Sequence, residues 1–302
     1  VKAGYTFAKD RRDLMNYKGG KLLGLFSSSH MPFTVDVENT PGMALTTPTL
    51  ADMARAAIHE LKKGSNGFLL QIEGAKIDHA GHANDIAAML HEQLAFEEAV
   101  QAALDFARKD GNTLVVVTAD HGTGGPALNG IGNEYGDSTK GLEMVFGMKS
   151  SYGPLFDSIA SKPSAADLQG AVEAKLGVKL KGDDAAWLSG MMGGAEVKPG
   201  FNGDKGAALA HLMKPQIGIG WTSQNHTSDH TLVSAWGPGS ADFAGYTENI
   251  SHFGRILSAW EIKHTNPSMS FADAKKIMDR QKETASIFSP EDELSAWHQG
   301  LV

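Results

Sequence analysis

The stretch GFLLQIEGAKIDHAGH, residues 67–82, joins an apolar run to a group of carboxylates and imidazoles. Residues 67–73 are mainly apolar without alternation, a pattern typical of a parallel strand that is covered on both faces. Glu73, Asp78 and His82 follow where that strand should end. Ligand sites in open α/β sheets lie at the carboxyl ends of strands, so this stretch predicts both a fold class and a functional site.

A helix and a second apolar strand should follow. Asn84 or Asp85 can cap a helix that we predict to run through Ala107. The segment NTLVVVTADH, residues 112–121, is again an apolar run with polar residues at its end. A strand, a helix and a strand in this order form a βαβ unit with a right-handed crossover. We therefore predict an α/β fold with a doubly wound, mostly parallel sheet flanked by helices.

Residues 1–127 are assigned to a core α/β segment that carries the polar motifs. Residues 22–26 are apolar and predict a strand that leads into a loop rich in Ser, His and Pro. Thr49 and Asp52 match a capping box, so a helix should begin there and extend to about Lys63.

Residues 128–213 have a different character and are interpreted as an inserted helical subdomain or lid. Glycine is frequent, no strong strand run occurs, and three short amphipathic segments predict helices, at 164–175, 182–192 and 205–213.

Residues 214–302 are assigned as the return of the chain to the core. Within them TLVSAWGPG, residues 231–239, predicts a strand and a turn, and residues 249–263 and 271–285 predict helices.

Composition narrows the classes of ligand and partner. The chain has 302 residues, a net charge of −8 and no cysteine. The negative charge argues against nucleic acid or an anionic membrane as a partner, and no apolar run reaches the roughly 18 residues of a transmembrane helix. Without cysteine, the metal ligands available are His, Asp and Glu. The chain begins at Val1, so we expect a processed or truncated chain whose lack of a signal peptide says nothing about its compartment.

The polar residues are predicted to meet at one edge of the sheet. Glu73 ends one strand, and Asp120 and His121 end the next. Asp78 and His82 are spaced i, i+4, which places them on one face of a helical turn. Carboxylates at the ends of buried strands are costly unless they are paired or bind a metal. Oxygen and nitrogen ligands suit Zn²⁺, Mn²⁺ or Mg²⁺, and this number of ligands indicates at least two ions, as in phosphoryl-transfer sites.

Simpler interpretations exist for each residue taken alone. Asp120 could cap the following turn, and Glu73 and Asp78 could be acidic residues favoured near a helix N-terminus. The conjunction of several such residues at two strand ends favours the metal site.

Three motifs resemble those of the alkaline phosphatases. They are QIEGAKIDHAGH at 71–82, VTADHG at 117–122 and NHTSD at 225–229. The resemblance covers most of 20–125 and 218–262. TADHG alone is also similar to independent phosphoglycerate mutases and related phosphatases, whereas the longer first motif followed by His-Thr is much more specific.

The resemblance implies two zinc ions. Asp78 and His82, completed by His226, would bind one zinc, and Asp120 with His121 would bind the second.

The resemblance also implies one magnesium ion, which Glu73 would bind. His79 would touch phosphate directly or through water, and His230 is interpreted as structural or as a neighbour of the ligands. The histidines outside the motifs are interpreted as ordinary: His30, His59, His91, His211, His252, His264 and His298.

The implied activity is hydrolysis of phosphomonoesters through a phosphoserine intermediate. The family's nucleophilic serine and phosphate-binding arginine are expected upstream of Val1, so this chain alone could be inactive. Ser138, in YGDSTKG, follows an aspartate as the nucleophile does, but a polar turn residue is the simpler interpretation. Arg11 and Arg12 are interpreted as solvated surface charges.

The expected partners are a small phosphomonoester and inorganic phosphate, and the resemblance suggests a homodimer in the periplasm or outside the cell. Two alternatives stay open. One is another enzyme of the superfamily, a phosphodiesterase or a phosphomutase, although a mutase would lack the Glu73 segment. The other is a metal-binding fragment without catalytic activity.

Overall fold

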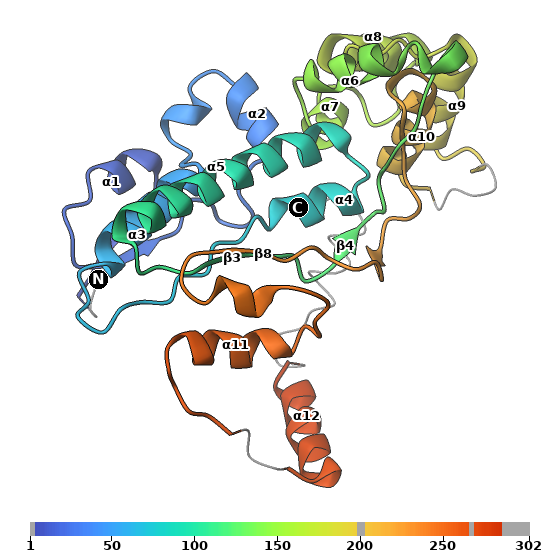
Figure 1. The fold of residues 1–302 in the computed structure, drawn as a ribbon. Helices are drawn as coiled ribbons and strands as arrows, with labels where there is room; N and C mark the ends of the chain where they lie inside the picture. The colour runs from blue at the N-terminus through green and yellow to red at the C-terminus, as the bar shows by residue number, and fades with distance from the viewer. Residues whose placement is uncertain (1–3, 198–202, 266–268, 286–302) are drawn as a thin grey trace. The chain divides into compact units, whose positions relative to one another are not determined.

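The structure is a computed structural model that describes residues 4–197, 203–265 and 269–285. The chain divides into two compact units, with the boundary after Ser240. Figure 1 traces the chain through these units from its N-terminus.

Helix α3 (Leu50–Leu61) begins at the predicted capping box. Thr49 Oγ1 accepts a hydrogen bond from Asp52 N, and Asp52 Oδ2 accepts one from Thr49 N, both at 3.1 Å. These two bonds satisfy backbone donors that a helix N-terminus otherwise leaves unpaired. The helix ends two residues before the predicted Lys63.

Arg11, at the start of α1 (Arg11–Met15), is not the solvated charge that the sequence predicts. Its Nε donates to Asp52 Oδ2 at 2.8 Å, and its Nη1 donates to the Ala44 carbonyl at 2.9 Å. The Asp52 carboxylate is buried, so an ion pair with Arg11 offsets the cost of shielding that charge from water. Arg12 is exposed, as predicted.

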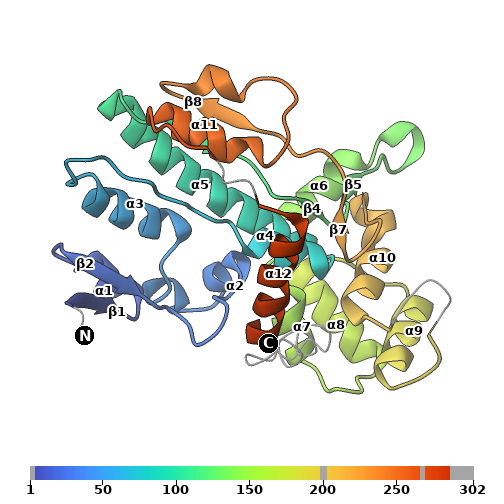
Figure 2. The ribbon, with the colours of Figure 1, turned by 90° about the horizontal axis from the view of Figure 1, so that it is seen from below.

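Helix α5 (Ile86–Asp110) is the long helix predicted after the polar stretch, three residues longer than expected. Asp85 is its N-cap and accepts from Ala88 N at 3.0 Å. Gly111 ends it in the left-handed conformation, with φ 75°, which a residue without Cβ adopts at low cost. In Figures 1 and 2, α5 runs alongside α3, and it also contacts α2 (Thr34–Asn39) and α4 (Lys76–His82).

Two strand ladders lie in the first unit near predicted strands. β1 (Tyr5–Ala8) pairs in parallel with β2 (Lys21–Gly24), which overlaps the strand predicted at 22–26. β3 (Val115–Val117) pairs in antiparallel fashion with β8 (Ser234–Trp236), and both lie within predicted strands.

Two further antiparallel ladders join distant parts of the chain. β4 (Gly122–Thr123) pairs with β7 (His226–Thr227), and β5 (Ala127–Leu128) pairs with β6 (Ile219–Gly220). As a result, the residues just after the TADH motif lie beside those of the NHT motif. The sequence contains no signal for this pairing, because each strand is only two residues long.

The strand predicted at 67–73 is not observed. These residues carry no strand assignment and take part in none of the ladders between described residues. Leu69 is 65% exposed, whereas a strand covered on both faces would bury it. An apolar run favours a strand only where a neighbouring strand offers hydrogen bonds, and the run itself does not report that neighbour.

Among the described residues, the helices between β5 and β6 share the larger of two buried apolar clusters. Leu155, Leu168 and Leu188 have no exposed surface in this cluster, and Ala87 of α5 belongs to it. The three amphipathic segments predicted between 164 and 213 are all helical. Figures 1 and 2 show these helices gathered beside the N-terminal end of α5. They are α6 (Ser138–Phe146), α7 (Tyr152–Asp157), α8 (Ala165–Leu176), α9 (Gly182–Met192) and α10 (Lys205–Ile217).

The second unit contains two predicted helices. α11 (Ser251–Ala259) is shorter than the helix expected at 249–263, and α12 (Phe271–Ala285) has the expected bounds.

Within the described residues, no helix combines the length and the apolar character needed to cross a membrane. Short 3-10 helices occur at η1 (Met43–Leu45), η2 (Asn133–Tyr135) and η3 (Ser240–Phe243).

Candidate metal centre

Helix α4 presents a carboxylate and an imidazole from one face. Asp78 and His82 are spaced i, i+4, and His82 Nε2 lies 3.4 Å from Asp78 Oδ2. Both side chains are partly buried. The helix therefore offers two metal-ligating atoms at one point in space.

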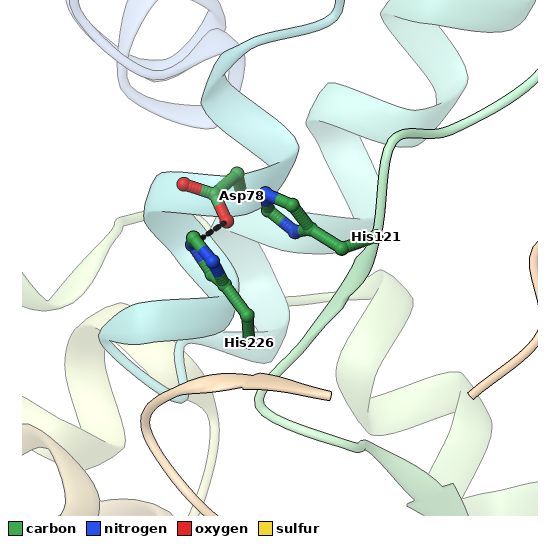
Figure 3. Close-up of side chains that lie close together, drawn as sticks. All are labelled: Asp78, His121 and His226. Carbon is green, nitrogen blue, oxygen red and sulfur yellow. Dashed lines mark ion pairs between the residues drawn. The ribbon is translucent and has the colours of Figure 1, made fainter. Parts of the chain in front are cut away.

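Two histidines from other segments complete a group with Asp78. His226 Nε2 lies 3.6 Å from Asp78 Oδ1 and 3.1 Å from His82 Nε2. The rings of His121 and His226 are stacked, with centroids 3.6 Å apart. Ligand atoms of Asp78, His121 and His226 all lie within 4.8 Å of one another, and Figure 3 shows these three side chains converging. We call Asp78, His82, His121 and His226 the metal cluster.

The β4–β7 ladder explains how His121 reaches His226. Thr123 is the register partner of His226, and Gly122 is the partner of Thr227. His121 directly precedes β4, so its side chain begins next to the strand that carries His226. Two motifs that lie more than a hundred residues apart in the chain thus become neighbours.

Hydrogen bonds orient the ligands within the metal cluster. His82 Nδ1 lies 2.6 Å from the Gln224 carbonyl, which can only accept, so Nδ1 carries the proton and Nε2 is the nitrogen that a metal could use. Thr123 Oγ1 donates to Asp78 Oδ1 at 2.5 Å and lies 3.3 Å from His121 Nδ1. Such outer contacts fix the tautomer and the direction of a ligand.

The distances among Asp78, His82 and His226 fit a zinc ion. Two ligands at about 2.0–2.1 Å from a tetrahedral zinc ion lie roughly 3.3 Å apart. The two histidine Nε2 atoms lie 3.1 Å apart, and the Asp78 carboxylate lies 3.4 Å from His82 through Oδ2 and 3.6 Å from His226 through Oδ1. Nitrogen and oxygen donors without sulfur also suit zinc.

Asp120 and Glu73 are not gathered into the metal cluster. The Asp120 side chain is 84% exposed, but its Oδ2 lies 3.4 Å from His121 Nε2, a spacing that two ligands of one zinc ion can also take. Glu73 is exposed and is absent from the group of three residues that the described part of the chain brings together.

His79 of α4 contacts His30. Its ring makes an edge contact with His30, with centroids 4.5 Å apart. Burial lowers the pKa of His79 to about 4, with further contributions from Lys76 and His30. His30 lies outside the three motifs and is therefore interpreted as ordinary from the sequence; its contact with His79 is visible only in the fold.

Sequence reasoning also missed Thr123 and Gln224. Thr123 directly follows the motif at 117–122 and Gln224 directly precedes the motif at 225–229, so their proximity to candidate ligands could have indicated a role. Ser138, a possible nucleophile in the sequence, lies at the start of α6, and its Oγ accepts a hydrogen bond from Ile131 N at 3.2 Å. His230 is exposed. Among the remaining histidines, His91 pairs with Glu38, and His298 lies outside the described residues.

Comparison with known proteins finds a matching family model and similar curated proteins. The family model for alkaline phosphatase matches residues 1–262. Alkaline phosphatase 3 of Bacillus subtilis (strain 168) is 34% identical over 261 residues, which is 85% of this chain and 53% of that protein.

Solved structures show the same fold. The crystal structure of Thermus thermophilus alkaline phosphatase has a TM-score of 0.80 and 27% identity, covering 92% of this chain and 61% of that one. The cold-active alkaline phosphatase of Shewanella sp. has a TM-score of 0.69 and 27% identity, covering 86% and 60%. These matches confirm the predicted α/β fold of the alkaline phosphatase type. The chain spans about half the length of the curated relatives it matches, as with the 53% of the Bacillus protein. The chain belongs to the alkaline phosphatase family.

Proposed function

We propose that this chain carries the metal centre of a phosphomonoester hydrolase that uses two zinc ions and one magnesium ion. The observation that supports this most strongly is the spacing among Asp78, His82 and His226, between 3.1 and 3.6 Å. These three residues would hold one zinc ion. The family to which the chain belongs then favours phosphomonoesters as the substrate class.

Asp120 and His121 would hold the second zinc ion. Their closest ligand atoms lie 3.4 Å apart, and His121 stacks on His226, so the two proposed zinc sites would be neighbours. Glu73 would bind magnesium, a proposal that rests on its place in the first motif. When bound, the ions would act as Lewis acids that stabilise charge on the attacking and leaving oxygens of phosphoryl transfer.

The protein's own groups would prepare this site. The Gln224 carbonyl keeps the proton on His82 Nδ1, and Thr123 holds one Asp78 oxygen through its hydroxyl. His79, next to Asp78 on α4, would touch the substrate phosphate directly or through water. A phosphoserine intermediate would use a serine other than Ser138, whose hydroxyl is engaged at the start of α6.

The remaining expectations are part of the same proposal. The substrate would be a small phosphomonoester and the product inorganic phosphate. The protein would act as a homodimer, in the periplasm or outside the cell.

The test measures hydrolysis by the purified protein that contains this chain, loaded with zinc and magnesium. We expect turnover of p-nitrophenyl phosphate, slower turnover of bis(p-nitrophenyl) phosphate, and a loss of at least about 100-fold in His226→Ala. The control is His59→Ala, which removes an exposed histidine of α3. Faster hydrolysis of the diester would indicate a phosphodiesterase, and isomerisation without release of phosphate would indicate a mutase. Zinc binding without any turnover would support the non-catalytic alternative.

A further inference from the structure

Asn84 joins the end of α4 to the loop that precedes His226. Its side chain is 4% exposed, and Nδ2 donates to the Gly81 carbonyl at 3.0 Å and to the Ser223 carbonyl at 2.8 Å. The first bond stays within the last turn of α4, and the second crosses to a segment about 140 residues away in the chain. One amide group therefore ties together two segments that carry proposed zinc ligands.

The backbones at this junction lie too close for any larger residue. A Cβ at Gly81 would meet Thr123 Cβ at 2.9 Å. A Cβ at Gly124 would meet the Gly81 carbonyl oxygen at 2.7 Å and the Trp221 ring at 2.8 Å. Three chain segments thus pack closely here, through the backbones of Gly81 and Gly124 and the ring of Trp221, and a small shift of one segment is transmitted to the others.

The hydrogen bonds at this junction are made by residues that are close in sequence to the proposed zinc ligands. Asn84 follows His82 by two residues, and Ser223 precedes His226 by three. Gln224 adds a second link, since its Nε2 donates to the His82 carbonyl at 3.2 Å. The 3.1 Å separation between His82 Nε2 and His226 Nε2 depends on how these two segments are held.

We propose that Asn84 is a positioning residue that holds His82 and His226 at the spacing one zinc ion requires. This inference rests on the zinc site of the proposed function. Asn84 would touch neither metal nor substrate and would act through the backbone carbonyls of Gly81 and Ser223.

Asparagine suits both demands of this position. Asn84 has φ 51°, in the left-handed region that asparagine tolerates better than most residues other than glycine. Its amide carries two N–H donors, one for each carbonyl. Glycine would keep the backbone conformation and lose both donors, so Asn84→Gly isolates the contribution of the side chain.

The experiment compares zinc affinity in Asn84→Gly and Asn129→Gly, measured by competition with a chelator of known affinity. Asn129 is a matched control, because its Nδ2 also donates to one nearby and one distant carbonyl, at Ala127 and Gly218, away from the metal cluster. We expect the zinc Kd to rise about 10- to 100-fold in Asn84→Gly and to change less than about twofold in the control.

A second measurement does not depend on a variant. In the wild-type protein without metal, the side-chain amide protons of Asn84 should exchange slowly with solvent, because both are hydrogen-bonded and buried. Rapid exchange would overturn the inference. An unchanged zinc Kd in Asn84→Gly, with only a lower free energy of unfolding, would also overturn it, since Asn84 would then serve stability alone.

The outcomes separate this inference from the proposed function. If the wild type binds zinc, Asn84→Gly weakens the binding and no phosphomonoester is hydrolysed, the positioning role stands and the phosphatase proposal fails. If the wild type hydrolyses phosphomonoesters and Asn84→Gly binds zinc equally well, the positioning role fails alone. Failure of the wild type to bind zinc would overturn both.

Discussion

At the scale of single residues, Asp85 shows how burial changes a common helix cap. It is 1% exposed, and besides Ala88 N it accepts a hydrogen bond from Tyr152 N at 2.5 Å. Burial raises the pKa of Asp85 to about 7, and the nearby Asp36 carboxylate acts in the same direction. The residue that starts α5 therefore also links that helix to the start of α7.

This raised pKa predicts a dependence of stability on pH. The folded protein keeps a proton on Asp85 up to about pH 7, whereas the unfolded chain releases it near the ordinary value of 3.8. The folded state thus binds more protons in this window, so the contribution of Asp85 to the free energy of unfolding falls as pH rises from about 4 to 7. The slope for one proton is at most about 1.4 kcal/mol per pH unit.

Urea unfolding of the wild type and Asp85→Asn at several pH values measures this slope. The difference between the two proteins should change between pH 4 and 7 and level off above 7. Asp105→Asn, an exposed position on the same helix, is the control and should follow the wild type. Parallel curves for Asp85→Asn and the wild type would contradict a raised pKa.

At the scale of elements, the helices α6–α10 are held by an apolar core of their own side chains together with Ala87 of α5. α8 and α9 contact each other closely, and α10 contacts both α6 and α9. Leu188 of α9 is fully buried among them. The position of these helices therefore depends on packing rather than on the weak intrinsic stability of short helices.

Truncation of Leu188 tests that dependence. Leu188→Ala should lower the free energy of unfolding by about 2–5 kcal/mol, because it removes apolar atoms that are buried on folding and leaves a cavity. Leu128→Ala is the matched control: Leu128 is 75% exposed, and its truncation should change stability by less than about 0.5 kcal/mol. Equal effects of the two substitutions, measured by urea unfolding, would show that this core is not tightly packed.

At the scale of the first compact unit, the metal cluster joins segments that are far apart in the chain. Asp78 and His82 come from α4, His121 directly precedes β4, and His226 comes from β7. The two proposed zinc ions would therefore have their complete sets of ligands only in the folded chain. Metal binding is therefore coupled to folding.

Removal of zinc should lower the thermal stability of the protein. Free zinc at a concentration of about 100 times its Kd would add about 2.7 kcal/mol to the free energy of unfolding, and chelation would remove this contribution. Differential scanning calorimetry with and without a chelator measures the change in Tm. Asp78→Ala should lose the response to the chelator, whereas His59→Ala should retain it. A Tm that does not respond to chelation in the wild type would contradict a metal site at the cluster.

The local features of this protein are largely determined by its sequence. The capping box at Thr49, the cap at Asp85 and the i, i+4 pair on α4 all involve residues within about four positions of one another. Backbone sterics and short-range hydrogen bonds decide such features, so spacing and residue type are enough to predict them. The ligand types follow from the absence of cysteine.

The tertiary structure alone decided which distant segments meet. Pairing of β4 with β7 sets His121 beside His226, and the Gln224 carbonyl selects the tautomer of His82. Conversely, the apolar run at 67–73 has the composition of a strand but takes part in no described ladder. Contacts across more than a hundred residues depend on how the whole chain packs, and local patterns carry no record of that packing. The sequence thus determined which groups could bind a metal, and the fold decided which of them come together.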